Sequence, residues 1–340
     1  MVATRDKFAG CLIGQALGDA LGFPVEGEGP AVCGAYARDV VRAGKAPAAG
    51  RADFPFGQYS DDTQLARELV LSWRDRGGFD AGDYAARIAR LFAEDKVVGR
   101  GRATEQAAER LIAGVPWFQA GTPAPSAGNG SAMRAGPLGL LMWDDPEAMV
   151  RAAIDQGRIT HADPRCLAGS VAVAGAVALA ARDGDLAPKA FLAQLREWTG
   201  RIEPSFESAL RRLEPLLDLP ADQAARAVAR DGLPPGVDSQ WHGGISAFVV
   251  GSVLWALWSF LKSPDDWLGV VAQAVAPGGD VDTTAAMAGC MAGARLGLSG
   301  LPGDLARAVT DRGEWGYDEL VALADAAFDR RWTGGERRRG

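Results

Sequence analysis

Two short acidic motifs are the parts of this sequence best suited to metal chemistry. One is Ser60-Asp61-Asp62-Thr63, and the other is Gly278-Gly279-Asp280-Val281-Asp282-Thr283. Each precedes an apolar stretch with helical spacing, so both are expected at helix N-termini. One N-cap needs a single such side chain, whereas each motif supplies three or four. If the two turns face each other, four carboxylates converge, and hard divalent cations that prefer oxygen ligands would relieve their repulsion.

Two glycine-flanked loops could bind an anion through backbone N–H groups. Gly99–Arg102 precedes a helix expected from about Thr104, and Gly128–Arg134 precedes another at Pro137. Loops of this kind hold phosphates where they meet a helix N-terminus. His161 lies in a third segment, just before Asp163-Pro164. A lone histidine at a helix start is more often a capping or packing group than a catalyst.

The elements that must position these motifs are predicted to be helices throughout. Thr4, Asp80, Asp163 and the segment Ser263–Asp266 are N-terminal helix signals, two of them with proline at the first helical position. Runs of alternating β-branched residues are nearly absent, so the fold class is all-α. The expected helices include residues 4–22, 64–73, 207–217, 221–228, 285–296 and 317–328.

Composition excludes several classes of function. With 36 basic and 43 acidic residues the formal net charge is −7, which is unlike a nucleic-acid-binding protein. Only 2 of 340 residues are histidine, too few for most zinc or haem sites. The 4 cysteines are scattered and form no CxxC pair, which favours buried thiols in a reducing compartment. The polar N-terminus resembles no signal peptide, so we expect a cytoplasmic protein.

One charge-free stretch, Gly243–Leu261, is long enough to cross a bilayer. It contains three glycines and three serines and has only Lys262 as a positive flank. A helix that is apolar on all sides is also expected at the centre of a large helical protein. We therefore predict a buried core helix and no membrane association.

No linker divides the chain into parts. The sequence predicts a single domain over residues 1–333, followed by a flexible basic tail over 334–340. We expect a monomer.

Taken in order, these motifs resemble the ADP-ribosylglycohydrolase family, which includes the enzyme that reactivates dinitrogenase reductase. The resemblance spans nearly the whole chain, through Gly10–Gly22, Pro24-Val25-Glu26, Ser60–Thr63, Gly128–Arg134, Thr160-His161 and Gly278–Thr283. It implies a compact orthogonal multi-helix bundle with an active-site cleft and a binuclear magnesium centre, in which Mn²⁺ could substitute. The implied function is hydrolysis of the glycosidic bond between ADP-ribose and an acceptor, which is a protein side chain or a small molecule.

The resemblance also assigns roles to individual residues. The metal ligands it implies are Ser60, Asp61, Asp62, Asp280, Asp282 and Thr283. The substrate-binding residues it implies are Glu26, Gly101, Asn129, Gly130, Ser131, Met133 and His161. Glu26, Asp61 and Asp280 are the catalytic candidates; the general base is either Glu26 or one of the aspartates.

Two positions depart from the family pattern. Ser60 replaces a threonine and keeps its hydroxyl. Gly99-Arg100-Gly101 stands where the arginine-releasing branch has Asp-Ile-Gly, so ADP-ribosyl-arginine is expected to be a poorer substrate here. A second hypothesis is a non-catalytic ADP-ribose-binding or structural protein on the same scaffold, as some lens crystallins are.

Overall fold

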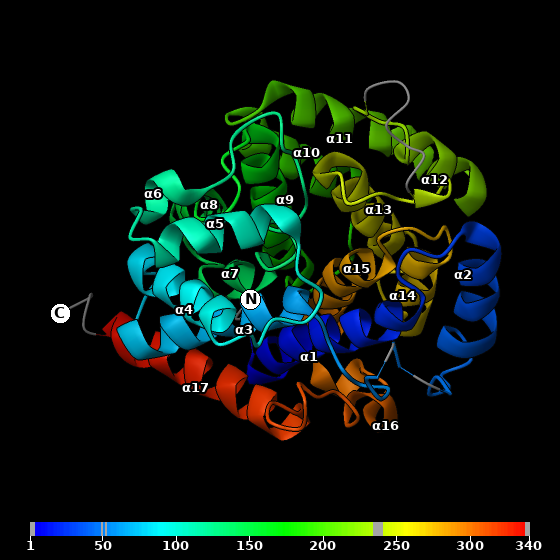
Figure 1. Ribbon diagram of the computed structural model, residues 1–340. Helices are drawn as coiled ribbons and strands as arrows, with labels where there is room; N and C mark the ends of the chain where they lie inside the picture. Colours follow the sequence, from blue (N-terminus) through cyan, green and yellow to red (C-terminus); the bar gives the residue numbers. More distant parts are fainter. Residues whose placement is uncertain (1–3, 49, 52, 234–240, 337–340) are drawn as a thin grey trace.

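The computed structural model describes residues 4–48, 50–51, 53–233 and 241–336 (Figure 1). In these residues the regular structure is helical, with isolated bridges but no β-strand, which confirms the predicted all-α class. The buried apolar side chains, from Phe8 to Ala327, form one continuous cluster. The single domain over residues 1–333 stays a prediction.

The chain forms helices along its whole described length. Their bounds are α1 Arg5–Gly22, η1 Phe23–Val25, α2 Pro30–Tyr36, η2 Ala37–Val41, α3 Asp61–Arg76, α4 Ala81–Ala93, α5 Arg102–Ile112, α6 Trp117–Ala120, α7 Gly136–Leu141, α8 Pro146–Arg158, α9 Pro164–Ala180, α10 Pro188–Gly200, α11 Pro204–Leu216, α12 Ala221–Val228, α13 Val249–Lys262, α14 Trp267–Val275, α15 Val281–Leu296, η4 Leu298–Gly300, α16 Gly303–Ala306 and α17 Tyr317–Glu336.

Most of the predicted helix starts are correct. The side chains of Thr4, Asp80 and Asp163 accept hydrogen bonds from backbone N–H groups in the first turns of α1, α4 and α9. The start predicted at Ser263-Pro264 is wrong by three residues, because Asp266 is the N-cap of α14. Ser263 instead ends α13, and its carbonyl accepts the N–H of Asp266 at 2.9 Å, which closes a turn between the two helices.

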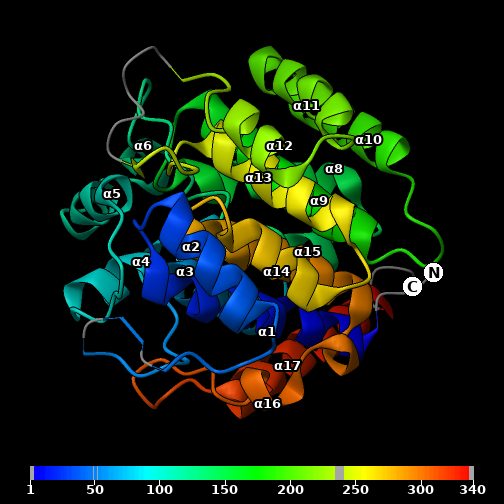
Figure 2. The same cartoon turned by 90° about the vertical axis from the view of Figure 1, so that its right-hand side faces the viewer.

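Helices α1 and α15 lie against each other at the centre of the protein (Figures 1 and 2). They run antiparallel, with Gly10 of α1 opposite Gly293 and Gly22 opposite Asp282. A Cβ at Gly18 would lie 2.2 Å from the carbonyl oxygen of Ala285, so only glycine permits this approach. The contact fixes the acidic start of α15 beside the C-terminal end of α1.

The apolar helices pack inside the protein's own core. Helix α13 occupies the second half of the charge-free stretch, and every residue from Val249 to Leu261 is buried, which confirms the core prediction. Within the described chain, Arg5–Val25 has the length and hydropathy to span a membrane, and 89% of that window is buried. This burial is what a core helix requires.

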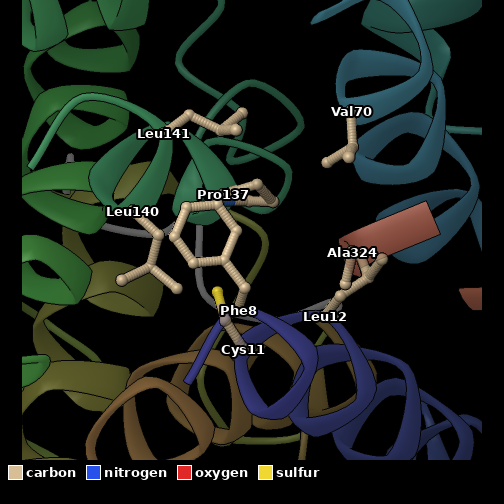
Figure 3. A pocket seen from close by; sticks show the side chains of 8 residues that line it. All are labelled: Phe8, Cys11, Leu12, Val70, Pro137, Leu140, Leu141 and Ala324. Carbon is tan, nitrogen blue, oxygen red and sulfur yellow. The ribbon is translucent and has the colours of Figure 1, made fainter. Parts of the chain in front are cut away.

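The four cysteines are buried free thiols. Cys11 and Cys290 face each other between α1 and α15, with 3.2 Å between their sulfur atoms. Cys11 also lines a small apolar cavity with residues of α3, α7 and α17 (Figure 3). At about 10 Å³ this cavity is too small for a ligand, so it is a packing gap.

The C-terminal helix extends beyond its predicted end. Helix α17 was expected to end at Phe328, but its backbone continues to Glu336. The first three residues of the predicted tail, 334–336, are therefore helical. Residues 337–340 lie outside the described residues.

Candidate metal centre and anion-binding loop

The two acidic motifs face each other at the starts of α3 and α15. Ser60 is the N-cap of α3, and Asp280 is the N-cap of α15. The hydroxyl of Thr283 donates to Oδ2 of Asp62 at 3.3 Å, which joins the motifs directly. Ser60 Oγ donates to the same carboxylate oxygen at 3.1 Å. The two turns therefore do face each other in the structure, which is the condition under which the sequence predicted that their carboxylates converge.

All four aspartates are nearly inaccessible to solvent. Asp61, Asp62, Asp280 and Asp282 have exposed fractions of 4%, 2%, 5% and 5%. Burial raises the pKa of each carboxyl group, and negative neighbours add to the rise for Asp61, Asp62 and Asp282. The cost of burying a charge on Asp280 is partly offset, because the side-chain amide of Asn129 donates a hydrogen bond to its Oδ2 at 2.6 Å. Among the residues that the structure describes, no lysine or arginine forms an ion pair with these four aspartates.

The donor set fits hard divalent cations. Ligand oxygens of Glu26, Asp280 and Asp282 lie within 4.8 Å of one another, a spacing that one ion could bridge. Asp62 contributes a different signal, because its Oδ1 atom is buried and has no hydrogen-bond partner. A buried carboxylate oxygen without a partner is costly unless a cation occupies its free lone pairs. The chemistry is oxygen-only, as Mg²⁺ and Mn²⁺ prefer.

Glu26 differs from the aspartates in exposure and in charge environment. It follows the short helix η1 and is half-buried, with 24% of its side chain exposed. Its carboxylate forms an ion pair with Arg51, whose guanidinium also lies 5.3 Å from the centre of the Phe23 ring. Sequence reasoning missed Arg51, because it lies in a loop with no motif around it.

Two polar residues of α1, one helical turn apart, hold the site together. Asp19 is fully buried and accepts the backbone N–H of Ser60 at 2.9 Å and the hydroxyl of Thr63 at 2.6 Å. Gln15 donates to the carbonyls of Asp62 at 3.0 Å and Met133 at 3.1 Å. Neither residue was singled out from sequence, although a polar side chain on an otherwise apolar buried helix was the available signal.

The loop before α5 also contacts the acidic cluster. Gly101 lies close to Asp61, since a Cβ built there would lie 4.0 Å from Oδ2 of that carboxylate. Gly99 has φ +75°, and a Cβ there would lie 3.4 Å from Oδ1 of Asp61. An aspartate at this position would add a fifth acid beside the cluster. Arg100 turns away from the site to pair with Asp95 and Glu105.

The second glycine loop begins beside Asp280 and leads into α7. The N–H of Asn129 is bonded to the carbonyl of Ala247 at 3.0 Å, while its side chain holds Asp280. Within the described chain, the backbone N–H groups of Gly130 and Ser131 have no acceptor. Two adjacent free N–H donors in a turn are suited to binding an anion.

Ser131 and Met133 contribute less to this surface than the sequence suggested. The Ser131 hydroxyl donates to the carbonyl of Cys166 at 3.2 Å, so its side chain is already engaged. Met133 is buried in the hydrophobic cluster, and its carbonyl accepts from Gln15. The structure therefore brings the backbone of this loop to the site rather than these two side chains.

The ring of His161 packs against the same loop at Gly128 and Gly130. Its ring is 2% exposed, and a Cβ at Gly130 would lie 2.8 Å from Cε1. Burial, with a smaller contribution from the positive charge of Arg134, lowers the pKa of His161 to about 3. The imidazole is thus neutral at physiological pH.

Comparison with known proteins gives consistent results. The family described as ADP-ribosylglycohydrolase matches residues 1–337. The chain is 30% identical over 325 residues to ADP-ribosylhydrolase ARH3 of Xenopus tropicalis, covering 89% of this chain and 90% of that protein. It is 26% identical to ADP-ribosylarginine hydrolase Tri1 of Pseudomonas putida, covering 96% of this chain and 78% of that one.

The fold also matches a solved structure. A chain described as "ADP-ribosylglycohydrolase-related protein complex" superposes with a TM-score of 0.71 at 28% sequence identity. The match covers 96% of this chain and 98% of the solved one. The similarity therefore extends over nearly the whole fold.

Proposed function

This chain belongs to the ADP-ribosylglycohydrolase family, and we propose that it is a magnesium-dependent hydrolase that cleaves ADP-ribose from an acceptor. The observation that carries the proposal is the meeting of the two aspartate motifs around a buried, unpartnered oxygen of Asp62. Relatives named as ADP-ribosylhydrolases support the reaction class. Hydrolysis would break the bond between the anomeric carbon of the ribose and the acceptor atom.

Two ions would be held by the oxygens of the two motifs. We assign Ser60, Asp61 and Asp62 from the start of α3 and Asp280, Asp282 and Thr283 from the start of α15 as ligands. Their burial and the hydrogen bonds of Ser60 and Thr283 to Asp62 support this assignment. When bound, such ions supply positive charge that offsets the carboxylates and orients the hydroxyls of the substrate ribose. Asn129 would keep Asp280 in its ligand orientation through the 2.6 Å hydrogen bond.

Glu26 is the residue we assign as general base. It has the largest exposure among the site carboxylates, and its oxygen lies within 4.8 Å of ligand oxygens of Asp280 and Asp282. It would take a proton from the water that attacks the anomeric carbon as the bond to the acceptor breaks. The aspartates are less suited to this role, because their oxygens face one another inside the cluster.

The diphosphate of ADP-ribose would bind at the second glycine loop. The free backbone N–H groups of Gly130 and Ser131 support this assignment, because they present two donors beside the metal ligand Asp280. The neutral ring of His161 packs against that loop. Gly101 borders the site at Asp61.

The acceptor is proposed to be other than arginine. Gly99 replaces the acid of the arginine-releasing branch, so the carboxylate of that branch is missing beside Asp61. One relative is named as an ADP-ribosylarginine hydrolase, so arginine is the alternative to test.

The decisive experiment is a substrate panel assayed with magnesium and with a chelator. We expect ADP-ribose release from at least one of ADP-ribosyl-serine, ADP-ribosyl-arginine, O-acetyl-ADP-ribose and poly-ADP-ribose, abolished by the chelator and restored by Mg²⁺ or Mn²⁺. Tight ADP-ribose binding with no turnover of any substrate would favour the non-catalytic alternative.

A further inference from the structure

The ring nitrogens of His161 have different environments. Nδ1 lies 2.8 Å from the hydroxyl oxygen of the preceding residue, Thr160. Nε2 faces the glycine loop instead, since Cβ atoms built at Gly128 and Gly130 would lie 3.6 Å and 3.2 Å from it. Within the described chain no hydrogen-bond partner is found for Nε2. Which nitrogen carries the proton therefore decides whether the ring presents a donor or an acceptor to the loop.

The hydroxyl of Thr160 decides between these tautomers. Nη2 of Arg134 donates to that oxygen at 2.7 Å, and a guanidinium can only donate. Thr160 is fully buried, and Nδ1 of His161 is the one acceptor available to its O–H in the described chain. If Nδ1 carried the proton, the hydroxyl hydrogen would be buried without an acceptor, which is unfavourable. The hydrogen-bond chain thus runs from Arg134 through Thr160 to Nδ1, and the proton of the neutral ring is on Nε2.

Arg134 is held for this role by an unusual set of partners. It is fully buried, donates to the side chain of Gln156 at 2.9 Å, and lies 5.6 Å from the Tyr84 ring centre. No carboxylate of the described chain forms an ion pair with it. Its charge acts at longer range: it lowers the pKa of Asp61 and that of His161, and it would also attract an anion at the neighbouring loop.

The same guanidinium also orients the loop backbone. Nη1 of Arg134 donates to the carbonyl of Gly130 at 2.9 Å. In a planar trans peptide the carbonyl of one residue and the N–H of the next point in opposite directions. The N–H of Ser131 therefore points away from Arg134, and it has no acceptor within the described chain.

We propose that Arg134 is a positioning residue for the anionic part of the substrate. Through Thr160 it holds His161 as the Nε2–H tautomer, and through Gly130 it directs the Ser131 N–H outward. The two donors then bind oxygen atoms of a diphosphate, with the buried guanidinium behind them. This inference rests on the proposed function for the identity of the ligand, but the tautomer itself does not depend on catalysis.

The tautomer can be measured directly, because the chain has only 2 histidines. His242 is exposed and has φ +49°, so His242→Asn, with a residue that tolerates positive φ, leaves His161 as the single imidazole. In this background, ¹⁵N NMR at neutral pH is expected to show a protonated Nε2 and an unprotonated Nδ1. A protonated Nδ1 would overturn the proposal, whatever the enzyme's activity.

Variants of Thr160 test the consequence for binding. In Thr160→Val the ring loses its partner at Nδ1, and we expect a mixture of tautomers and at least a tenfold rise in KM and in the Kd for ADP-ribose, with kcat changed less than threefold. Thr160→Ser keeps the hydroxyl and should restore both the single tautomer and the wild-type Kd. Unchanged binding in a folded Thr160→Val protein would overturn the proposal.

The two proposals fail in different ways. If no substrate is hydrolysed but the Nε2–H tautomer and ADP-ribose binding are observed, the hydrolase assignment fails and the role of Arg134 and Thr160 stands. If substrates are hydrolysed while Nδ1 carries the proton, only the positioning role fails. Should Thr160→Val not fold, the ¹⁵N spectrum of the protein with intact Thr160 still decides.

Discussion

The hydroxyl of Thr283 donates a hydrogen bond to Oδ2 of Asp62 across 221 residues of sequence, at 3.3 Å. This contact joins the starts of α3 and α15, both of which also pack against α1. Asp19 and Gln15 of α1 hold the α3 side, and the glycine contacts of α1 hold the α15 side. The site is therefore an assembly of helix termini on one central helix.

Divalent metal is expected to stabilise the fold. In its absence, four buried aspartates face one another and burial disfavours their charge. At a metal concentration about a hundredfold above Kd, the free energy of unfolding should rise by about 2.7 kcal/mol for one site. A thermal melt with and without Mg²⁺ measures this. A melting temperature that does not respond to Mg²⁺ or Mn²⁺ would contradict the shared metal centre.

A ligand variant tests the assignment of Asp62. Asp62→Asn removes the negative charge of a carboxylate whose Oδ1 atom has no hydrogen-bond partner. The affinity for divalent metal should therefore fall by at least about tenfold. Asp304→Asn is the matched control, because Asp304 is exposed in the first turn of α16. Calorimetric titration with Mn²⁺ should show a loss in the first variant alone.

In the metal-free protein, the free energy of unfolding should depend on pH through the ionisation of Asp19. Burial raises the pKa of Asp19 from 3.8 to about 6. Its stabilising contribution is fully present below about pH 4 and is lost as pH rises through about 6. Relative to Asp19→Asn, wild type should therefore lose about 1 kcal/mol of stability between pH 5 and 7.5.

Denaturant unfolding of both proteins with chelator measures this difference. Comparing the two removes the contribution of His161, whose pKa, lowered to about 3, acts in the opposite direction below about pH 6.5. A difference that is constant with pH would show that Asp19 is ionised throughout this range.

The sequence was informative where local chemistry determines structure. Helix caps such as Thr4 and Asp80 act within one turn, so composition and spacing were enough to predict them. The acidic motifs could also be predicted as helix starts, because each has more capping side chains than one helix needs. Whether the two motifs meet could not be predicted from the sequence, because their meeting depends on the packing of α1 against α15.

Residues that act through distant contacts were not predictable in the same way. Arg51 pairs with Glu26 from a loop without a motif, and Thr160 gains its role from Arg134, 26 residues away. Ser131 carries a hydroxyl that suggested a ligand contact, yet the fold directs it to a carbonyl of α9. In each case the partner is set by tertiary packing rather than by neighbours in sequence.

The α1–α15 contact should tolerate no added methyl group. In Gly18→Ala the new Cβ would lie 2.2 Å from a backbone oxygen, so the helices would have to separate. We expect a loss of about 3 kcal/mol or more, together with weaker metal binding. Gly303→Ala in α16 meets nothing within 4 Å and should change stability by less than about 1 kcal/mol. Equal stability of the two variants would contradict the close packing.

Glu26→Gln should separate catalysis from binding. Removing a general base is expected to lower kcat by about a hundredfold or more, while ADP-ribose still binds through the glycine loop. Glu28→Gln is the control, since Glu28 is an exposed carboxylate two residues away. Single-turnover assays and calorimetry give the two quantities. If Glu26→Gln keeps more than a tenth of wild-type kcat, the base is one of the aspartates.

The acceptor preference should depend on Arg102 and not on Arg100. Both arginines border Gly101, but Arg100 is paired with Asp95 and Glu105, whereas Arg102 is exposed and has no partner in the described chain. A positive charge at the N-terminus of α5 disfavours a cationic guanidinium leaving group and has less effect on a neutral hydroxyl. We therefore expect ADP-ribosyl-serine to be cleaved with a higher kcat/KM than ADP-ribosyl-arginine.

Arg102→Gln should raise the ratio of kcat/KM for ADP-ribosyl-arginine to that for ADP-ribosyl-serine by about threefold at low salt, an effect that added salt removes. Arg100→Gln, which loses a charge already compensated by two acids, should leave the ratio unchanged. If arginine is the preferred acceptor in the wild-type protein, or if the two variants behave alike, the loop before α5 does not set acceptor specificity.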